Sequence, residues 1–102
     1  MAQLRLLAVP FFRVRFFVGG LMETRVAVMS MIVGKEGDVE HLNGLLHEYG
    51  KYIIGRMGIP YRERGINIIS VVLDAPQDEI SSLAGKIGNL KDVNVKTAYS
   101  NV

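Results

Sequence analysis

Runs of β-branched and aliphatic residues alternate with two helical patterns along this chain, and their order limits the fold more than any other feature. Strand-like runs occupy residues 25–33, 53–61, 66–73 and 93–99. Apolar residues recur at intervals of three and four between the first two runs, and again between the last two. With right-handed crossovers, this β-α-β-β-α-β order predicts an α+β, ferredoxin-like fold. It has a four-stranded antiparallel sheet of order 4-1-3-2 and two helices on one face.

The ends of both helices carry recognisable signals. The first helical stripe covers residues 39–49; Asp38 is placed to cap its N-terminus, and Gly50 is placed as a left-handed residue after its end. The second stripe covers residues 80–87 and follows a variant of the capping box that starts at Asp74. We therefore expect two short helices, each with its own cap.

Both predicted central strands have apolar side chains on both of their faces. The two helices cover only one face of the sheet, so one of the two sets would face water in a monomer. A bare apolar patch of this kind marks an interface, and a twofold dimer is its simplest form. We assign the exposed set, and with it a homo-oligomer interface, to Met29, Met31, Ile69 and Val71.

The first 21 residues differ from the rest of the chain. They contain Arg5, Arg13 and Arg15 and no acidic residue, and their apolar run is broken by Pro10. This pattern fits neither a secretory signal nor a membrane-spanning helix. We expect residues 1–21 to be a leader, a non-native or disordered extension read from upstream DNA, and residues 22–102 to form one domain that starts naturally at Met22.

The composition excludes several kinds of chemistry. The chain has no cysteine, so disulfides, thiolate zinc sites and cysteine nucleophiles are excluded, and we expect a cytoplasmic protein. No nucleophile elbow or paired-carboxylate site is visible, so we predict no catalytic residues, no enzyme activity and no cofactor. His41 and His47 do not share a helical face at metal-ligand spacing, and we predict no metal site within one chain. A metal shared between subunits is left open, with Glu40 and Glu48 nearby.

Nucleic-acid binding requires a separate test, because RNA-recognition domains share this fold. Their third strand begins with a basic residue and glycine, as Arg64-Gly65 does here, and then presents aromatic rings on which bases stack. This chain has Ile66, Ile68 and Val71 instead. Beyond the leader, the acidic residues outnumber the basic ones by one. We therefore expect no direct nucleic-acid binding.

The turn "GKEGD" before the first helix resembles a phosphate-binding loop only superficially. It matches neither the P-loop nor the dinucleotide pattern, and Glu36, Asp38 and Glu40 crowd the helix N-terminus with negative charge. We predict that it holds no phosphate. Arg56, Arg62 and Arg64 form a cluster of arginines around the second strand and the turn after it. This cluster is either a solvated hairpin end or an anion or carboxylate clamp beside a subunit interface.

The stretch "EGDVEHLNGLLHEYGKYI", residues 36–53, resembles the first turn and helix of ACT domains, which are small-molecule sensing modules of this topology. "GRMGIPYRERGINIISVVLDAP" and "ISSLAGKIGNLKDVNVKT" resemble, more narrowly, the ACT-like iron-only hydrogenase system regulators. The resemblance extends from residue 22 to about residue 98. Gly44, which disfavours a helix interior, would in this pattern let the helix lie close to the sheet.

This resemblance implies a cytoplasmic, oligomeric regulatory module connected with hydrogenase maturation or expression, and any control of transcription would need a protein partner. ACT domains bind effectors at subunit interfaces beside the first turn, which implies effector contacts at Gly34, Gly37 and Asp38, and we add Arg56 as the anion-binding side chain. The Asp-x-Pro-Gly form of amino-acid sensors is missing here, which argues against an amino acid. A purely structural oligomerisation module and a small metal- or RNA-binding domain are the alternative interpretations.

Overall fold

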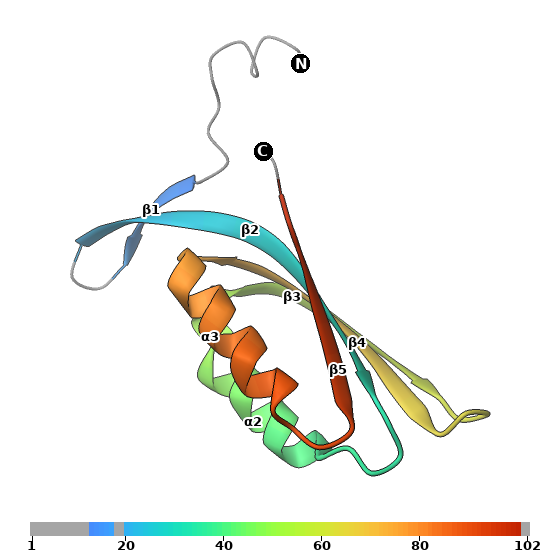
Figure 1. Ribbon diagram of the computed structural model, residues 1–102. Helices are drawn as coiled ribbons and strands as arrows, with labels where there is room; N and C mark the ends of the chain where they lie inside the picture. Colours follow the sequence, from blue (N-terminus) through green and yellow to red (C-terminus); the bar gives the residue numbers. More distant parts are fainter. Residues whose placement is uncertain (1–12, 18–19, 101–102) are drawn as a thin grey trace, which may run out of the picture.

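The computed structural model of this chain describes residues 13–17 and 20–100, with side chains from residue 23 onward. Its elements follow the predicted order, with an additional strand at the start of the chain (Figure 1). They are β1 (Arg13–Phe17), β2 (Gly20–Val33), α2 (Val39–Glu48), the 3-10 turn η1 (Gly50–Tyr52), β3 (Ile53–Tyr61), β4 (Ile66–Ala75), α3 (Gln77–Gly88) and β5 (Val93–Tyr99).

The sheet has the predicted topology. Strands β5, β2, β4 and β3 lie in that order and all pairs are antiparallel, which is the order 4-1-3-2 of a ferredoxin-like fold. β2 and β4 are the central strands, while β3 and β5 form the edges. Both helices pack on one face of this sheet, as Figure 1 shows. The predicted α+β fold class is therefore confirmed.

The N-terminal part of β2 extends beyond the predicted domain border. β2 begins at Gly20 and pairs with β1, so that Arg13 lies opposite Thr24 and Phe17 lies opposite Gly20. The predicted border at residue 22 thus falls inside a strand. Residues 1–12 and 18–19 of the predicted leader lie outside the described residues, and the division into a leader and a domain stays a prediction.

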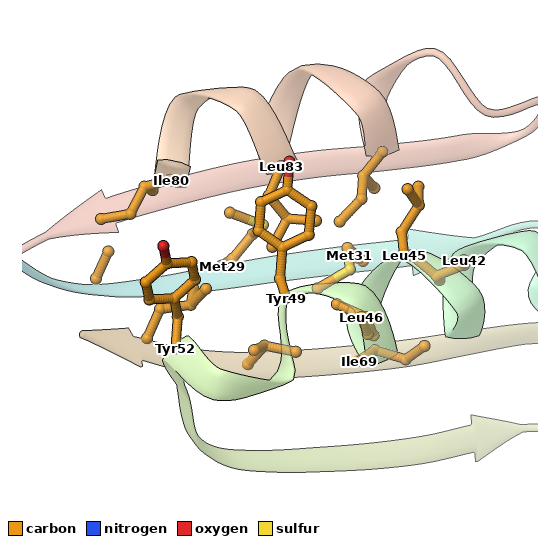
Figure 2. Close-up of a cluster of buried hydrophobic side chains, with 14 of the residues drawn as sticks. Met29, Met31, Leu42, Leu45, Leu46, Tyr49, Tyr52, Ile69, Ile80 and Leu83 are labelled. Atoms are coloured by element: carbon orange, nitrogen blue, oxygen red, sulfur yellow. The ribbon is translucent and has the colours of Figure 1, made fainter. Parts of the chain in front are cut away.

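The hydrophobic core lies between the sheet and the two helices (Figure 2). Met29 and Met31 of β2 are fully buried there, beneath Leu42 and Leu46 of α2 and Leu83 of α3. Burying a side chain of this size stabilises the fold by about 1.5–3 kcal/mol. The core is thus built from the helix-facing residues of the central strands together with the apolar stripes of both helices.

This arrangement contradicts the predicted interface residues. Met29, Met31, Ile69 and Val71 are between 0% and 5% exposed, because their side chains point toward the helices. Neighbouring residues of a strand point to opposite faces. The exposed set therefore consists of the residues that alternate with the predicted ones. The open face carries five apolar residues that are 36–59% exposed: Val28 and Ile32 of β2, Ile68 of β4, and Met57 and Ile59 of β3.

Three local predictions about the helices have different outcomes. Asp38 caps α2 as predicted, since its Oδ1 accepts a hydrogen bond from the His41 backbone N–H at 2.9 Å. Gly50 does not end the helix in a left-handed conformation; it begins η1, which turns the buried Tyr52 into the core. Asp74 does not cap α3, because β4 continues to Ala75 and Asp74 is a buried residue of that strand.

Gly44 also differs from its prediction. It lies in the interior of α2 but faces solvent, and a Cβ atom built on it would meet nothing within 4 Å. The helix therefore does not need a glycine here in order to approach the sheet.

Candidate functional site

A hollow of about 230 Å³ lies on the helix side of the edge strand β3. It exists because the apolar stripe of α2 packs toward the core, while every residue of β3 from Arg56 to Tyr61 is exposed. The residues that line it come from α2, β3 and β4: Val39, Asn43, Arg56, Gly58, Ile59, Pro60, Asn67 and Ile69.

The polar groups of the hollow come from three different elements. Arg56 of β3 donates a hydrogen bond from Nη2 to Oδ1 of Asn43 on α2 at 2.6 Å. Asn67 of β4 enters the lining from the neighbouring strand, where it is paired with Pro60. Arg56 is the only charged residue among the described residues that line the hollow. The hollow therefore combines one cation, two amides and an apolar floor.

The turn between β2 and α2 is stabilised by hydrogen bonds within the protein. The Gly34 N–H donates to the backbone oxygen of Asp92 at 2.8 Å, and the Glu36 N–H donates to Oδ2 of Asp92 at 3.0 Å. The Gly37 N–H donates to the Gly34 oxygen at 3.0 Å. The N–H groups that an anion would need are thus engaged in protein hydrogen bonds, which agrees with the prediction that this turn holds no phosphate.

Both glycines of this turn have a packing reason. A Cβ atom on Gly34 would collide with the carboxylate of Asp92, and one on Gly37 would collide with the side chain of Val33. Asp92 itself has a positive φ of 56°, a conformation that aspartate and asparagine tolerate better than most residues. Gly34 is therefore explained by close packing against Asp92 in the turn before β5, and Gly37 by close packing against Val33 of β2.

The four predicted effector residues do not come together at the hollow. Arg56 lines it, whereas Gly34, Gly37 and Asp38 belong to the turn and none of them is among its lining residues. The carboxylate of Asp38 is engaged with His41: Oδ1 accepts the capping hydrogen bond from the His41 N–H, and Oδ2 lies 3.8 Å from the ring Nδ1.

The predicted arginine cluster is also divided. Arg62 and Arg64 lie in the β3–β4 turn, where Gly65 has a positive φ of 66°. Arg56 precedes that turn by more than five residues of extended strand, roughly 16–20 Å of chain. It therefore acts at a different place from the other two.

Sequence reasoning missed Asn43, Asn67 and Pro60. One signal was available, because Asn43 follows Val39 by four residues and so shares its face of the helix. Asn67 is brought to the hollow only by the pairing of β4 with β3, which no local pattern reveals.

Two further properties concern the described part of the chain. Within it, no group of three histidine, cysteine, aspartate or glutamate side chains is placed to hold a metal ion. None of its helices is long and apolar enough to cross a membrane.

Fold and site together define a small ferredoxin-like α+β domain with a hollow at one sheet edge. A family model described as "TM1266-like: Iron-only hydrogenase system regulator, putative" matches residues 25–97. This chain belongs to that family. Among solved structures it is similar to the uncharacterized protein TM1266 from Thermotoga maritima, with 36% identity and a TM-score of 0.73 over 76% of this chain and 98% of that chain. No curated protein matches.

The family assignment confirms the narrower resemblance predicted from residues 22–98. The fold is compatible with the wider ACT-like group.

Proposed function

We propose that this chain is a non-catalytic regulatory module that binds a small effector and acts as a homo-oligomer. The observation that carries the proposal is the hollow between α2 and β3, in a chain that belongs to a family of regulators. The absence of cysteine supports a cytoplasmic site of action.

The lining of the hollow supports binding rather than catalysis. Acid–base and nucleophilic catalysis need a titratable or nucleophilic side chain within hydrogen-bond reach of the reacting atoms. The lining contains no histidine, carboxylate, serine, threonine, lysine or tyrosine among the residues described. Arg56 binds anions but does not exchange its proton near neutral pH.

The open sheet face supports a homo-oligomer. The five apolar side chains Val28, Ile32, Met57, Ile59 and Ile68 are about half exposed and lie on adjacent strands. Covering them would contribute roughly 3–7 kcal/mol before the costs of association. Strand β3 takes part in both surfaces: Ile59 points into the apolar patch, while its neighbours Gly58 and Pro60 face the hollow on the other side of the strand. An effector in the hollow would therefore contact the opposite face of a strand that belongs to the proposed interface, where it is placed to change the stability of the assembly.

A thermal-shift screen of the full chain against carboxylic acids, amino acids, nucleotides and divalent metals tests effector binding. A ligand at 100 times its Kd adds about 2.7 kcal/mol to the free energy of unfolding. A dimer that no compound stabilises would favour the alternative of a purely structural oligomerisation module, which the apolar patch also supports.

Light scattering during gel filtration tests the assembly. We expect a dimer at micromolar concentration that dissociates in an Ile32→Ser variant. The matched control is His47→Ser, an exposed position on α2 in the helix layer, which should leave the dimer intact. A monomeric wild-type chain would contradict the oligomer.

A further inference from the structure

We propose that the hollow between α2 and β3 takes a small monocarboxylate with a branched apolar tail and no amino group. The inference rests on the proposed function, because it names the class of ligand that the same hollow would bind. Three properties of the hollow carry it: its single cation, its apolar floor and its lack of a lining carboxylate.

The polar side of the hollow is suited to a carboxylate. A guanidinium is planar and has five N–H donors, and two of them can bind one carboxylate side by side. The bond from Arg56 Nη2 to Oδ1 of Asn43 uses one donor and fixes the guanidinium against α2. Because Oδ1 of Asn43 accepts this bond, its amide NH₂ is a further donor at the same place. Arginine and amide donors together match the lone pairs of a carboxylate.

The remaining lining is apolar and partly exposed. Val39 of α2 is 38% exposed, Pro60 of β3 is exposed on the helix side, and the buried Ile69 forms the floor. An aliphatic tail that covers these side chains removes apolar surface from water, which favours binding. A hollow of about 230 Å³ has room for roughly eight groups of the size of water, at ~30 Å³ each. The carboxylate 4-methylpentanoate has about this many non-hydrogen atoms.

The hollow offers no partner for an ammonium group. None of its lining residues is acidic, and Asp38, which precedes Val39, is engaged with the backbone and the ring of His41. The ammonium group of an amino acid would lie near the Arg56 cation and would lose hydration without gaining a salt bridge. A carboxylate should therefore bind better than the amino acid of the same tail, and much better than the amine.

Isothermal titration calorimetry of the full chain tests this ranking with 4-methylpentanoate, leucine, 4-methylpentan-1-amine and inorganic phosphate. We expect 4-methylpentanoate to bind at least tenfold more tightly than leucine, and the amine and phosphate to bind still more weakly. Arg56→Gln should weaken 4-methylpentanoate at least tenfold. The matched control Arg62→Gln, which removes an arginine from the β3–β4 turn, should leave the affinity unchanged. Circular dichroism would verify that both variants fold.

The outcomes separate the ligand class from the proposed function. Leucine that binds as tightly as 4-methylpentanoate, or an equal loss in both variants, would overturn the proposed class while leaving an effector site in place. Phosphate that binds as tightly would also overturn it, since charge alone would then determine binding. If neither these probes nor any compound of the thermal-shift screen binds, the proposed function fails as well.

Discussion

Gly44→Ala should stabilise this protein, because the structure gives the glycine no packing role. Residue 44 lies inside α2 (Val39–Glu48), is exposed, and has nothing within 4 Å of a Cβ atom built on it. Alanine would neither gain nor lose a contact there. The whole effect should therefore come from the difference in helix propensity and in the freedom of the unfolded chain.

The expected size follows from this comparison. Alanine is favoured over glycine in a helix interior by about 0.8–1 kcal/mol, which corresponds to a rise in Tm of roughly 4–8 °C for a domain of this size. Thermal unfolding followed by circular dichroism measures it. The matched control is Gly37→Ala, whose Cβ would collide with the Val33 side chain and lie 3.2 Å from the backbone oxygens of Gly34 and Asp92. That variant should lose stability.

A lower Tm for Gly44→Ala would refute the reasoning. It would mean that the outer face of α2 is packed in solution, for example against a second copy. The Tm difference would then depend on protein concentration, because subunit association contributes to stability by mass action.

Three further predictions follow from single contacts. Asp92→Ala should lower the free energy of unfolding in urea by about 2–3 kcal/mol, because it removes a hydrogen-bond acceptor and places alanine at positive φ. Asp92→Asn should lower it by less than about 1 kcal/mol. Equal losses in the two variants would contradict this. Met31→Ala should cost about 2–5 kcal/mol and Ile32→Ala about 1 or less in the monomer, and the reverse order would contradict the assignment of faces. A hydrogen bond to Tyr49 raises the pKa of Lys86 above its ordinary 10.5. Lys86→Met should therefore be less stable than wild type at pH values below 10.5, and the difference in stability should disappear as the pH rises through the raised pKa. A stability difference that does not depend on pH would exclude this linkage.

The sequence predicts the architecture well, because strand runs and helical stripes are local patterns. The bounds of β3 and β5 agree with prediction, and the order of the elements leaves few topologies. Which face of β2 is buried could not be read from β2, since both of its faces are apolar. The signal lay in β5, where Val95 alternates with polar residues and is paired with Met31. The buried face of β2 can be inferred from β5 only when the register between the two strands is known.

The candidate site was only partly predictable. The charge of Arg56 made it a candidate for anion binding, but the sequence grouped it with the arginines of the β3–β4 turn. Asn43 and Asn67 come together with Arg56 because α2 lies beside a sheet edge, which is a tertiary arrangement. The turn glycines gave a misleading signal, since close packing of Gly34 against Asp92 and of Gly37 against Val33 accounts for both without a ligand.

The central claim is that a small branched monocarboxylate binds in the hollow between α2 and β3. Amide chemical shifts of the isotopically labelled full chain, recorded during a titration with 4-methylpentanoate, test it most directly. We predict saturable changes that are largest at Asn43, Gly58 and Asn67. Changes centred instead on Gly34 and Gly37 would place the ligand at the turn before α2, and the absence of saturable changes would show that this compound does not bind; either result would contradict the claim.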